Sequence, residues 1–132
     1  MTLTESAPMG IDVPRPGVYT ITVRGTLDRL VGARLLRLVD ARLQMASHHH
    51  APTRHVLLDV SGLDGIGPGG EAALRHAAHA TTRRGITFDL VGAAALAGRL
   101  GMVERQVLSR HRSFPDVPTA LAELAGGVSA PP

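Results

Sequence analysis

The chain has 132 residues, a length that fits one domain and leaves little room for a second. It contains no cysteine and no lysine, which excludes disulfides, thiol nucleophiles, cysteine-ligated zinc, Schiff-base chemistry and a P-loop lysine. Aromatic residues make up only 2% of the chain. The net charge is +3, and the arginines are scattered along the sequence. Both features argue against a nucleic-acid partner.

Both ends of the chain lack the apolar periodicity of packed structure. Residues 1–9 are predicted to form a flexible arm and residues 126–132 a flexible tail, on either side of a domain at 10–125. The N-terminal residues show no charged region followed by an apolar run, so they do not resemble a signal peptide. The longest apolar stretch, residues 91–100, is too short to span a bilayer. We therefore expect a cytoplasmic protein with no membrane partner.

Strands are predicted from alternating or continuous apolar runs that are bounded by glycine and proline. In chain order, the expected strands are residues 11–13, 18–24, 55–60, 87–91 and 106–109. In the second of these, Tyr19, Ile21 and Val23 are expected to share one face. The run at 55–60 is apolar almost throughout, which favours a central strand that is covered on both faces.

Helices are predicted where apolar residues recur about every 3.6 positions. In chain order, the expected helices are residues 29–46, 71–83, 93–100 and 118–124. Asp28 is a suitable N-cap for the first helix. Pro68 stands where the second helix is expected to begin, and Gly85 is expected to end it. The glycines and the proline of residues 61–70 predict a loop before that helix.

Strands that alternate with helices imply parallel pairing through right-handed crossovers, with the helices packed on the sheet. The sequence therefore predicts an α/β single domain, with a central, mostly parallel sheet of four to five strands packed by about four helices. No nucleophile–base pair and no constellation of metal ligands accompanies this order of elements, so an enzyme is the least expected class.

Three segments of the chain, taken in order, resemble the STAS domain of anti-sigma factor antagonists. The first is GTLD at 25–28, between a predicted strand and a predicted helix. The second is VLLDVSGLDGIGPGGEAAL at 56–74, and the third is RRGITFDLVGAAALAGRLGM at 83–102. The resemblance covers about residues 10–125. It implies a STAS-like fold, no cofactor, no catalysis, and a protein-binding role in signalling and transcription regulation.

The second segment departs from the family pattern at one position. Regulated members of the family carry Asp-Ser-Ser-Gly there, and a serine is phosphorylated by the partner, an anti-sigma factor that is a serine kinase. This chain has Gly67, Pro68, Gly69 and Gly70 instead, so the phosphoacceptor position is occupied by Gly69, which has no hydroxyl. A phosphate there would place about two negative charges on a docking surface, although a helix N-terminus tolerates anions. The resemblance thus implies an antagonist that lacks the usual switch.

The resemblance also implies a partner-binding surface around this loop and the start of the following helix. Its residues are Asp28, Gly67, Pro68, Gly69, Gly70, Glu71 and Arg75. Glu71 and Arg75 have the spacing of a favourable ion pair on a helix. Glu71 stands where the family often has an apolar residue, which favours a surface that serves another partner. The expected partner is an anti-sigma factor or a serine-kinase-like regulatory protein.

Two other functions are compatible with the sequence. The chain can be a scaffold or sensor component of an assembly, with other STAS proteins or further copies of itself as partners and no sigma factor involved. Alternatively, the backbone amides of GIGPGG at 65–70 can bind a nucleotide or another small ligand. Against that second alternative, Pro68 has no amide hydrogen, and the lysine of a P-loop is absent.

The histidines are interpreted as surface groups. His48, His49 and His50, with His55 nearby, have no acidic or cysteine ligand close to them in the sequence, so we expect no metal site there. The histidines at positions 76 and 79 share a predicted helix face with arginines, whose charge repels a metal ion.

Two carboxylates are given structural roles, and two hydroxyls near the same loop are candidates for modification. Asp59 and Asp64 lie near the end of the central strand, where carboxylates can act as acids or bases. Beyond Ser61, the loop supplies no histidine, serine or lysine partner, so we expect them to cap the strand and to accept hydrogen bonds. Ser61 and Thr26 carry hydroxyls near the same loop and are the alternative candidates for phosphorylation.

Overall fold

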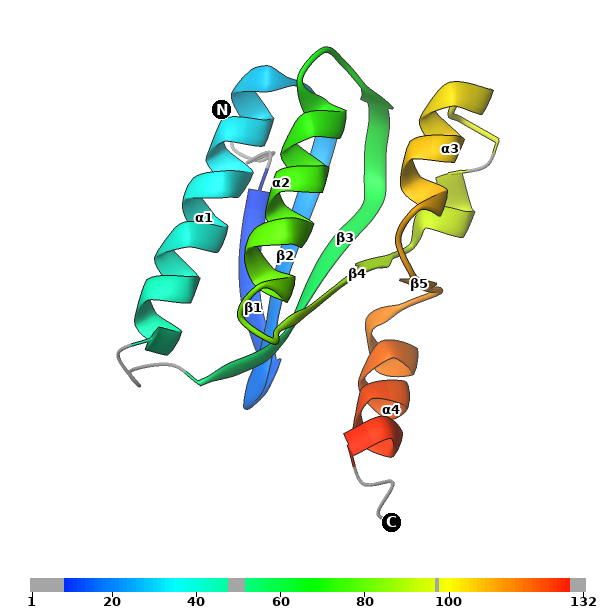
Figure 1. The fold of residues 1–132 in the computed structure, drawn as a ribbon. Helices are drawn as coiled ribbons and strands as arrows, with labels where there is room; N and C mark the ends of the chain where they lie inside the picture. Colours follow the sequence, from blue (N-terminus) through cyan, green and yellow to red (C-terminus); the bar gives the residue numbers. More distant parts are fainter. Residues whose placement is uncertain (1–8, 48–51, 97, 129–132) are drawn as a thin grey trace, which may run out of the picture.

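The computed structural model describes residues 9–47, 52–96 and 98–128, which form a five-stranded sheet flanked by helices (Figure 1). The strands are β1 (Met9–Arg15), β2 (Gly17–Leu27), β3 (Thr53–Ile66), β4 (Thr87–Val91) and β5 (Ser113–Phe114). They lie in the order β1-β2-β3-β4-β5. β1 is antiparallel to β2, and every other neighbouring pair is parallel. The predicted α/β class and its mostly parallel sheet are confirmed.

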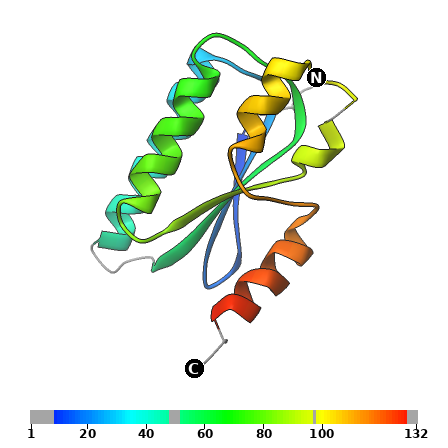
Figure 2. The same ribbon diagram turned by 45° about the vertical axis from the view of Figure 1, so that its right-hand side comes forward.

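Helices cover both faces of this sheet, but unequally (Figure 2). They are α1 (Arg29–Ser47), α2 (Gly70–Thr82), the 3₁₀ turn η1 (Ala93–Leu96), α3 (Met102–Ser109) and α4 (Val117–Val128). Side chains of α1, α2, η1 and α3 pack with one face of the sheet in a large apolar core. On the opposite face, α4 packs on a smaller cluster. Within the described residues, no helix is long and apolar enough to cross a bilayer.

The alternation predicted for β2 is confirmed by the two cores. Tyr19, Ile21 and Val23 belong to the large core, whereas Val18 belongs to the cluster under α4. β3 is the central strand of the sheet, as its continuous apolar run predicts. Its alternate residues therefore bury side chains on both faces.

The prediction of a loop over 61–70 is largely wrong, because β3 continues to Ile66. This extension pairs with the end of β2, where Arg24 lies beside Gly62 and Leu27 beside Ile66, with shifts of register between them. Leu63 is fully buried and fixes the extension to the core. A Cβ at Gly62 would lie 3.2 Å from the side chain of Arg24, so a glycine suits this pairing.

The prediction of a strand at 106–109 is also wrong, because these residues end α3. Val107 and Leu108 are both buried, and two adjacent apolar residues fit either a strand or a helix. The edge strand is β5 instead, at Ser113–Phe114. The helix predicted at 93–100 is the shorter turn η1, and Gly101 precedes α3 rather than ending that helix.

The last helix is longer than predicted. α4 begins at Val117, where the Asp116 carboxylate accepts a hydrogen bond from the Thr119 amide at 2.7 Å. It ends at Val128, three residues into the segment predicted as a tail. The rest of that segment and residues 1–8 of the predicted arm lie outside the described residues.

Candidate functional site

The loop Gly67–Gly69 lies at the edge of the sheet where the parallel strands β2 and β3 end, between β3 and α2 (Figure 1). The start of α1 lies beside it. There the Asp28 carboxylate accepts a hydrogen bond from the Val31 amide at 3.0 Å, which confirms Asp28 as the N-cap of α1. Asp28 therefore has a structural role next to the loop, within the predicted binding surface.

Gly69 is the N-cap of α2 and has a left-handed backbone, with φ of 88°. A Cβ at this position would lie 3.0 Å from both Cα and Cβ of Arg29, closer than side chains normally approach. Glycine is the residue that combines a positive φ with such a close contact. A serine or threonine at position 69 is thus opposed by the backbone conformation and by the packing against α1.

The neighbouring glycines also stand where a side chain would approach another residue too closely. A Cβ at Gly70 would collide with the carbonyl oxygen of Leu27, and one at Gly67 would lie 3.2 Å from the Cβ of Asp28. The two helices beside the loop also approach closely, since a Cβ at Gly32 of α1 would lie 2.7 Å from the Cβ of Ala73. The glycines therefore hold the loop and α2 tightly against the end of β2 and the start of α1.

Three amides in and beside the loop are already hydrogen-bonded within the chain. The Gly67 amide donates to the carbonyl oxygen of Leu27 at 2.9 Å, and the Gly70 amide donates to that of Gly67 at 3.0 Å. The Ile66 amide donates to the Glu104 carboxylate of α3 at 2.9 Å. Pro68 has no amide hydrogen. A phosphate-binding loop needs free amides, and here a carboxylate already occupies the base of the loop.

Glu104 joins α3 to this loop. Its other carboxylate oxygen accepts a hydrogen bond from the Gly101 amide, at 2.8 Å. The hydrogen bonds from Ile66 and Gly101 stabilise the ionised form and lower the pKa of Glu104 below its ordinary value. We call the pair of bonds to these two amides the Glu104 clamp. The bond to Ile66 could not be read from the sequence, because its amide is 38 residues away from Glu104, whereas Gly101 is only 3 residues away, at the spacing of a capping box.

Glu71 forms its shorter ion pair with a residue that the sequence did not suggest. Its carboxylate lies 2.9 Å from the guanidinium of Arg110, which follows α3, and 3.9 Å from that of Arg75. The predicted pair with Arg75 therefore exists at a longer distance. All three side chains are well exposed, so their mutual attraction adds little stability. What the arrangement does is place a charged bridge between α2 and α3 beside the loop.

Apolar side chains stand exposed on both sides of the loop. Leu30, in the first turn of α1, is 65% exposed, and Met102 and Val103, in the first turn of α3, are 67% and 72% exposed. The sequence did not point to these three residues. Met102 and Val103 lie between the predicted helix at 93–100 and the predicted strand at 106–109, and the exposure of Leu30 depends on where the sheet ends. We define the carboxyl-edge surface as Leu30, Gly67–Gly69, Glu71, Arg75, Met102 and Val103.

The remaining candidate residues lie elsewhere or have structural partners. The Asp59 carboxylate accepts hydrogen bonds from the amide and hydroxyl of Ser61, at 3.0 and 2.7 Å, which confirms its structural role. Asp64 is exposed near the end of β3. Ser61 lies against the turn at Gly92 rather than on the loop. Thr26 is exposed and lies beside Gly67.

The histidines that the structure describes gather into no site. Nδ1 of His55 lies 2.7 Å from the hydroxyl of Thr87, and burial lowers the pKa of this imidazole. His76 and His79 are exposed on α2, and His48–His50 lie outside the described residues. Among the side chains that the structure describes, no three potential ligands are grouped to hold a metal ion.

Comparison with known proteins identifies the fold. No family model and no curated protein matches the sequence. Among solved structures, the chain is similar to a sulfate transporter family protein from Wolinella succinogenes, with a TM-score of 0.64 at 22% identity over 90% of this chain and 93% of that one. It is also similar to the anti-sigma factor antagonist SpoIIAA in its unphosphorylated form, with a TM-score of 0.57 at 10% identity over 90% and 98%. The fold is that of a STAS domain.

A STAS fold also occurs within a longer protein that resembles the chain. The murine Solute Carrier 26 family member A9 anion transporter, in its inward-facing state, matches with a TM-score of 0.64 at 18% identity. The match covers 85% of this chain and 18% of that one, so the chain spans less than a fifth of that protein's length. At these sequence identities the similarities establish the STAS fold alone. The binding partner of this chain has to be inferred from its surface.

Proposed function

We propose that this chain is a non-enzymatic protein-interaction module that acts as an anti-sigma factor antagonist and docks through the carboxyl-edge surface. The observation that carries the proposal is the exposure of Leu30, Met102 and Val103 around a loop where the amides of Ile66, Gly67 and Gly70 are hydrogen-bonded within the chain. Exposed apolar side chains with a charged rim suit contact with another protein. The rim is the bridge between Glu71 and Arg110.

The proposed partner is an anti-sigma factor with a serine-kinase-like fold. The likeness to SpoIIAA, which is described as an anti-sigma factor antagonist, supports this choice. Gly69 has no hydroxyl, and its backbone and its contact with Arg29 oppose a residue that carries one. Docking is therefore proposed to be independent of phosphorylation at position 69, with the surface held in one electrostatic state.

Substitution of the exposed apolar side chains tests this docking surface. Affinity capture from extracts of the source cells, followed by mass spectrometry, identifies the partner, and titration of the purified partner then gives the dissociation constant. We expect Leu30→Ser and Val103→Ser each to weaken binding by about tenfold, the effect of a residue at the centre of an interface. Their exposure means that neither change disturbs the core.

Met45→Ser is the matched control for Leu30→Ser. Met45 is an exposed apolar residue near the other end of the same helix, away from the loop, and it is 44% exposed. It should leave the affinity unchanged. If all three variants bind the partner as the wild type does, the carboxyl-edge surface is not the docking site. If the captured partner has no kinase-like fold, the antagonist role is wrong even where the surface is right.

A role in an assembly is the second candidate, and the edge of the sheet favours it. β1 is an edge strand, and its side chains Ile11 and Val13 are 56% and 47% exposed. An exposed apolar edge strand can pair with another chain. A large homo-oligomer in light scattering of the purified chain would favour the assembly, and a monomer or dimer would favour the antagonist. The hydrogen-bonded amides of the loop argue against the third reading, a nucleotide site at 65–70.

A further inference from the structure

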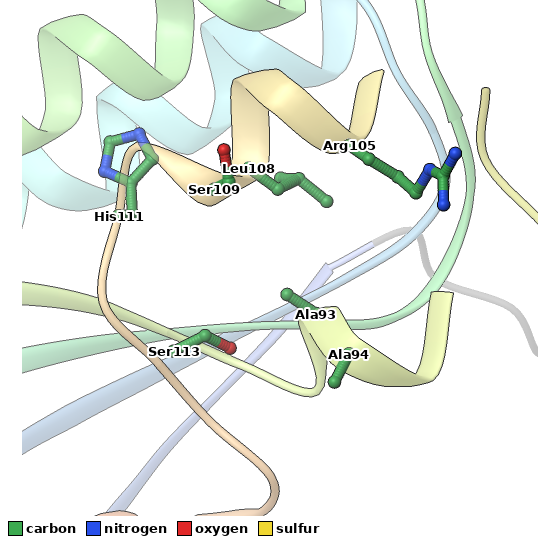
Figure 3. A pocket seen from close by; sticks show the side chains of 7 residues that line it. All are labelled: Ala93, Ala94, Arg105, Leu108, Ser109, His111 and Ser113. Carbon is green, nitrogen blue, oxygen red and sulfur yellow. The ribbon is translucent and has the colours of Figure 1, made fainter. Parts of the chain in front are cut away.

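A pocket of about 210 Å³ lies between η1 and α3 (Figure 3). Its middle is apolar and is formed by Ala93 and Ala94 of η1 and Leu108 of α3. Arg105 lies at one end, and the polar groups of Ser109, His111 and Ser113 line the other part. The sequence analysis assigned no role to any of these residues.

The size of the pocket sets the size of its ligand. An apolar cavity of about 150 Å³ is enough to hold benzene, which has six carbon atoms. On the same scale, a volume of about 210 Å³ holds an apolar body of about eight carbon atoms. The alanines at 93 and 94 are the reason that the space is open, since larger side chains on η1 would fill it against Leu108.

The charge at one end of the pocket favours an anion. Within the described part of the chain, the guanidinium of Arg105 has no acidic partner. The nearby carboxylates are already engaged. Glu104 binds two amides, Glu71 binds Arg110, and Asp89 binds Arg112 through both of its oxygens. Arg105 is therefore left as a free cation beside an apolar surface.

The other end of the pocket is polar but uncharged. His111 is half-buried with its ring edge-on to Phe88, at a centroid distance of 5.8 Å. Burial, and then the charge of Arg110, lowers the pKa of His111, so the imidazole is neutral at pH 7. Together with the hydroxyl of Ser113, it offers hydrogen bonds without a second charge, whereas the hydroxyl of Ser109 already donates to the carbonyl oxygen of Gln106 at 2.8 Å. A ligand with one negative charge suits this distribution better than one with two.

We propose that this pocket binds a small monocarboxylate with an apolar body of about eight carbon atoms. Its carboxylate pairs with Arg105, and its body covers Ala93, Ala94 and Leu108. The site is separate from the carboxyl-edge surface and does not depend on the proposed function. It shares α3 with the Glu104 clamp, since Glu104 and Arg105 are consecutive residues that project to different sides of the helix.

Titration of the ¹⁵N-labelled full chain with octanoate and with octan-1-ol, followed by NMR, tests the proposal. The two probes share an apolar chain, and only octanoate is charged. We expect saturable binding of octanoate, with shifts of the Ala93, Ala94 and Leu108 amides and an affinity about tenfold above that of octanol. Arg105→Gln should remove most of this preference. Ala94→Leu should weaken both probes, because its side chain fills the pocket and position 94 is exposed.

Arg83→Gln is the matched control, because it removes an exposed arginine from the end of α2 and should leave octanoate binding unchanged. Equal affinities for the two probes would overturn the assignment of Arg105. Shifts centred on other arginines, or an unchanged affinity in Ala94→Leu, would overturn the pocket as the site. The absence of saturable binding at millimolar concentrations would overturn the proposal as a whole.

Discussion

Gly69 combines a left-handed backbone with a close contact to Arg29, and the two effects can be measured apart. We expect Gly69→Ser to destabilise the fold by about 2–3 kcal/mol, from the positive φ and from overpacking against α1. Chemical denaturation followed by far-UV circular dichroism measures the free energy of unfolding. The introduced hydroxyl is thus expected to weaken the protein rather than to create an intact phosphorylation site.

Gly85 supplies the control for this substitution. It also has a positive φ, of 76°, but a Cβ there would meet nothing within 4 Å. Gly85→Ser should therefore cost about 1 kcal/mol, the backbone contribution alone. If the two serine variants are equally stable, the contact between position 69 and Arg29 does not constrain the loop.

At the scale of single residues, the sequence predicts chemistry better than geometry. It predicts the N-cap role of Asp28, because that role depends on residue type and on neighbours along the chain. The contact between Gly69 and Arg29 joins positions 40 residues apart, and the exposure of Leu30 depends on where the sheet ends. No local pattern carries information of that kind.

α3 is held to the loop by the Glu104 clamp, which makes its attachment sensitive to pH. The folded-state pKa of Glu104 is lowered, so ionisation of this group stabilises the folded chain. That contribution is fully present above the ordinary pKa of a glutamate, about 4.3, and is lost as the pH falls through the lower, folded value. Glu104→Gln cannot ionise and keeps a single acceptor oxygen for the two amides.

We therefore expect wild type to exceed Glu104→Gln in unfolding free energy at pH 7, with the difference shrinking as the pH falls below about 4.3. Denaturation curves for both proteins between neutral and acidic pH give this difference directly. Glu123→Gln, on the exposed side of α4, controls for the loss of a carboxylate far from the loop. A difference that is constant with pH would show that the clamp does not depend on ionisation.

At the scale of elements, prediction succeeded where a periodic apolar pattern was long. The 19 residues of α1 and the strand β4 were predicted to within one residue of their observed bounds. Prediction failed at 106–109 and 61–66. In the first case, two adjacent buried residues carry no period. In the second, glycines that usually end a strand lie inside β3, where β2 passes close by.

The two faces of the whole molecule have cores of very different size. Of the residues whose burial the structure describes, twenty belong to the core beneath α1, α2 and α3, and six belong to the cluster beneath α4. A helix with so little buried contact is expected to open before the rest of the fold. Hydrogen exchange at low denaturant should show amides of 117–125 exchanging with a smaller opening free energy than those of β2, β3 and α1. Exchange of all these amides in one global step would contradict this prediction.

A substitution at Arg15 tests the early opening of α4 in a second way. Its guanidinium donates a hydrogen bond to the Leu121 carbonyl oxygen at 3.0 Å, and so ties the turn between β1 and β2 to α4. Arg15→Ala should speed exchange in α4 and leave exchange in α1 unchanged.

At the scale of the whole molecule, the sequence was sufficient to predict the class of fold, since alternating strands and helices restrict the topology strongly. The unequal cores were not predictable, because they depend on how far α4 extends over the sheet.

The packing around Gly69 also limits which substitutions can be accepted at this position during evolution. Two of the three atoms nearest to an added Cβ are the Cα and the amide nitrogen of Arg29, which every amino acid possesses. No substitution at position 29 can remove them, so a serine at position 69 would need the start of α1 to move as well. A descendant of this protein could therefore acquire a modifiable hydroxyl here only through coordinated changes at position 69 and in the start of α1. For a lineage under selection for stability, a glycine in this setting is hard to replace.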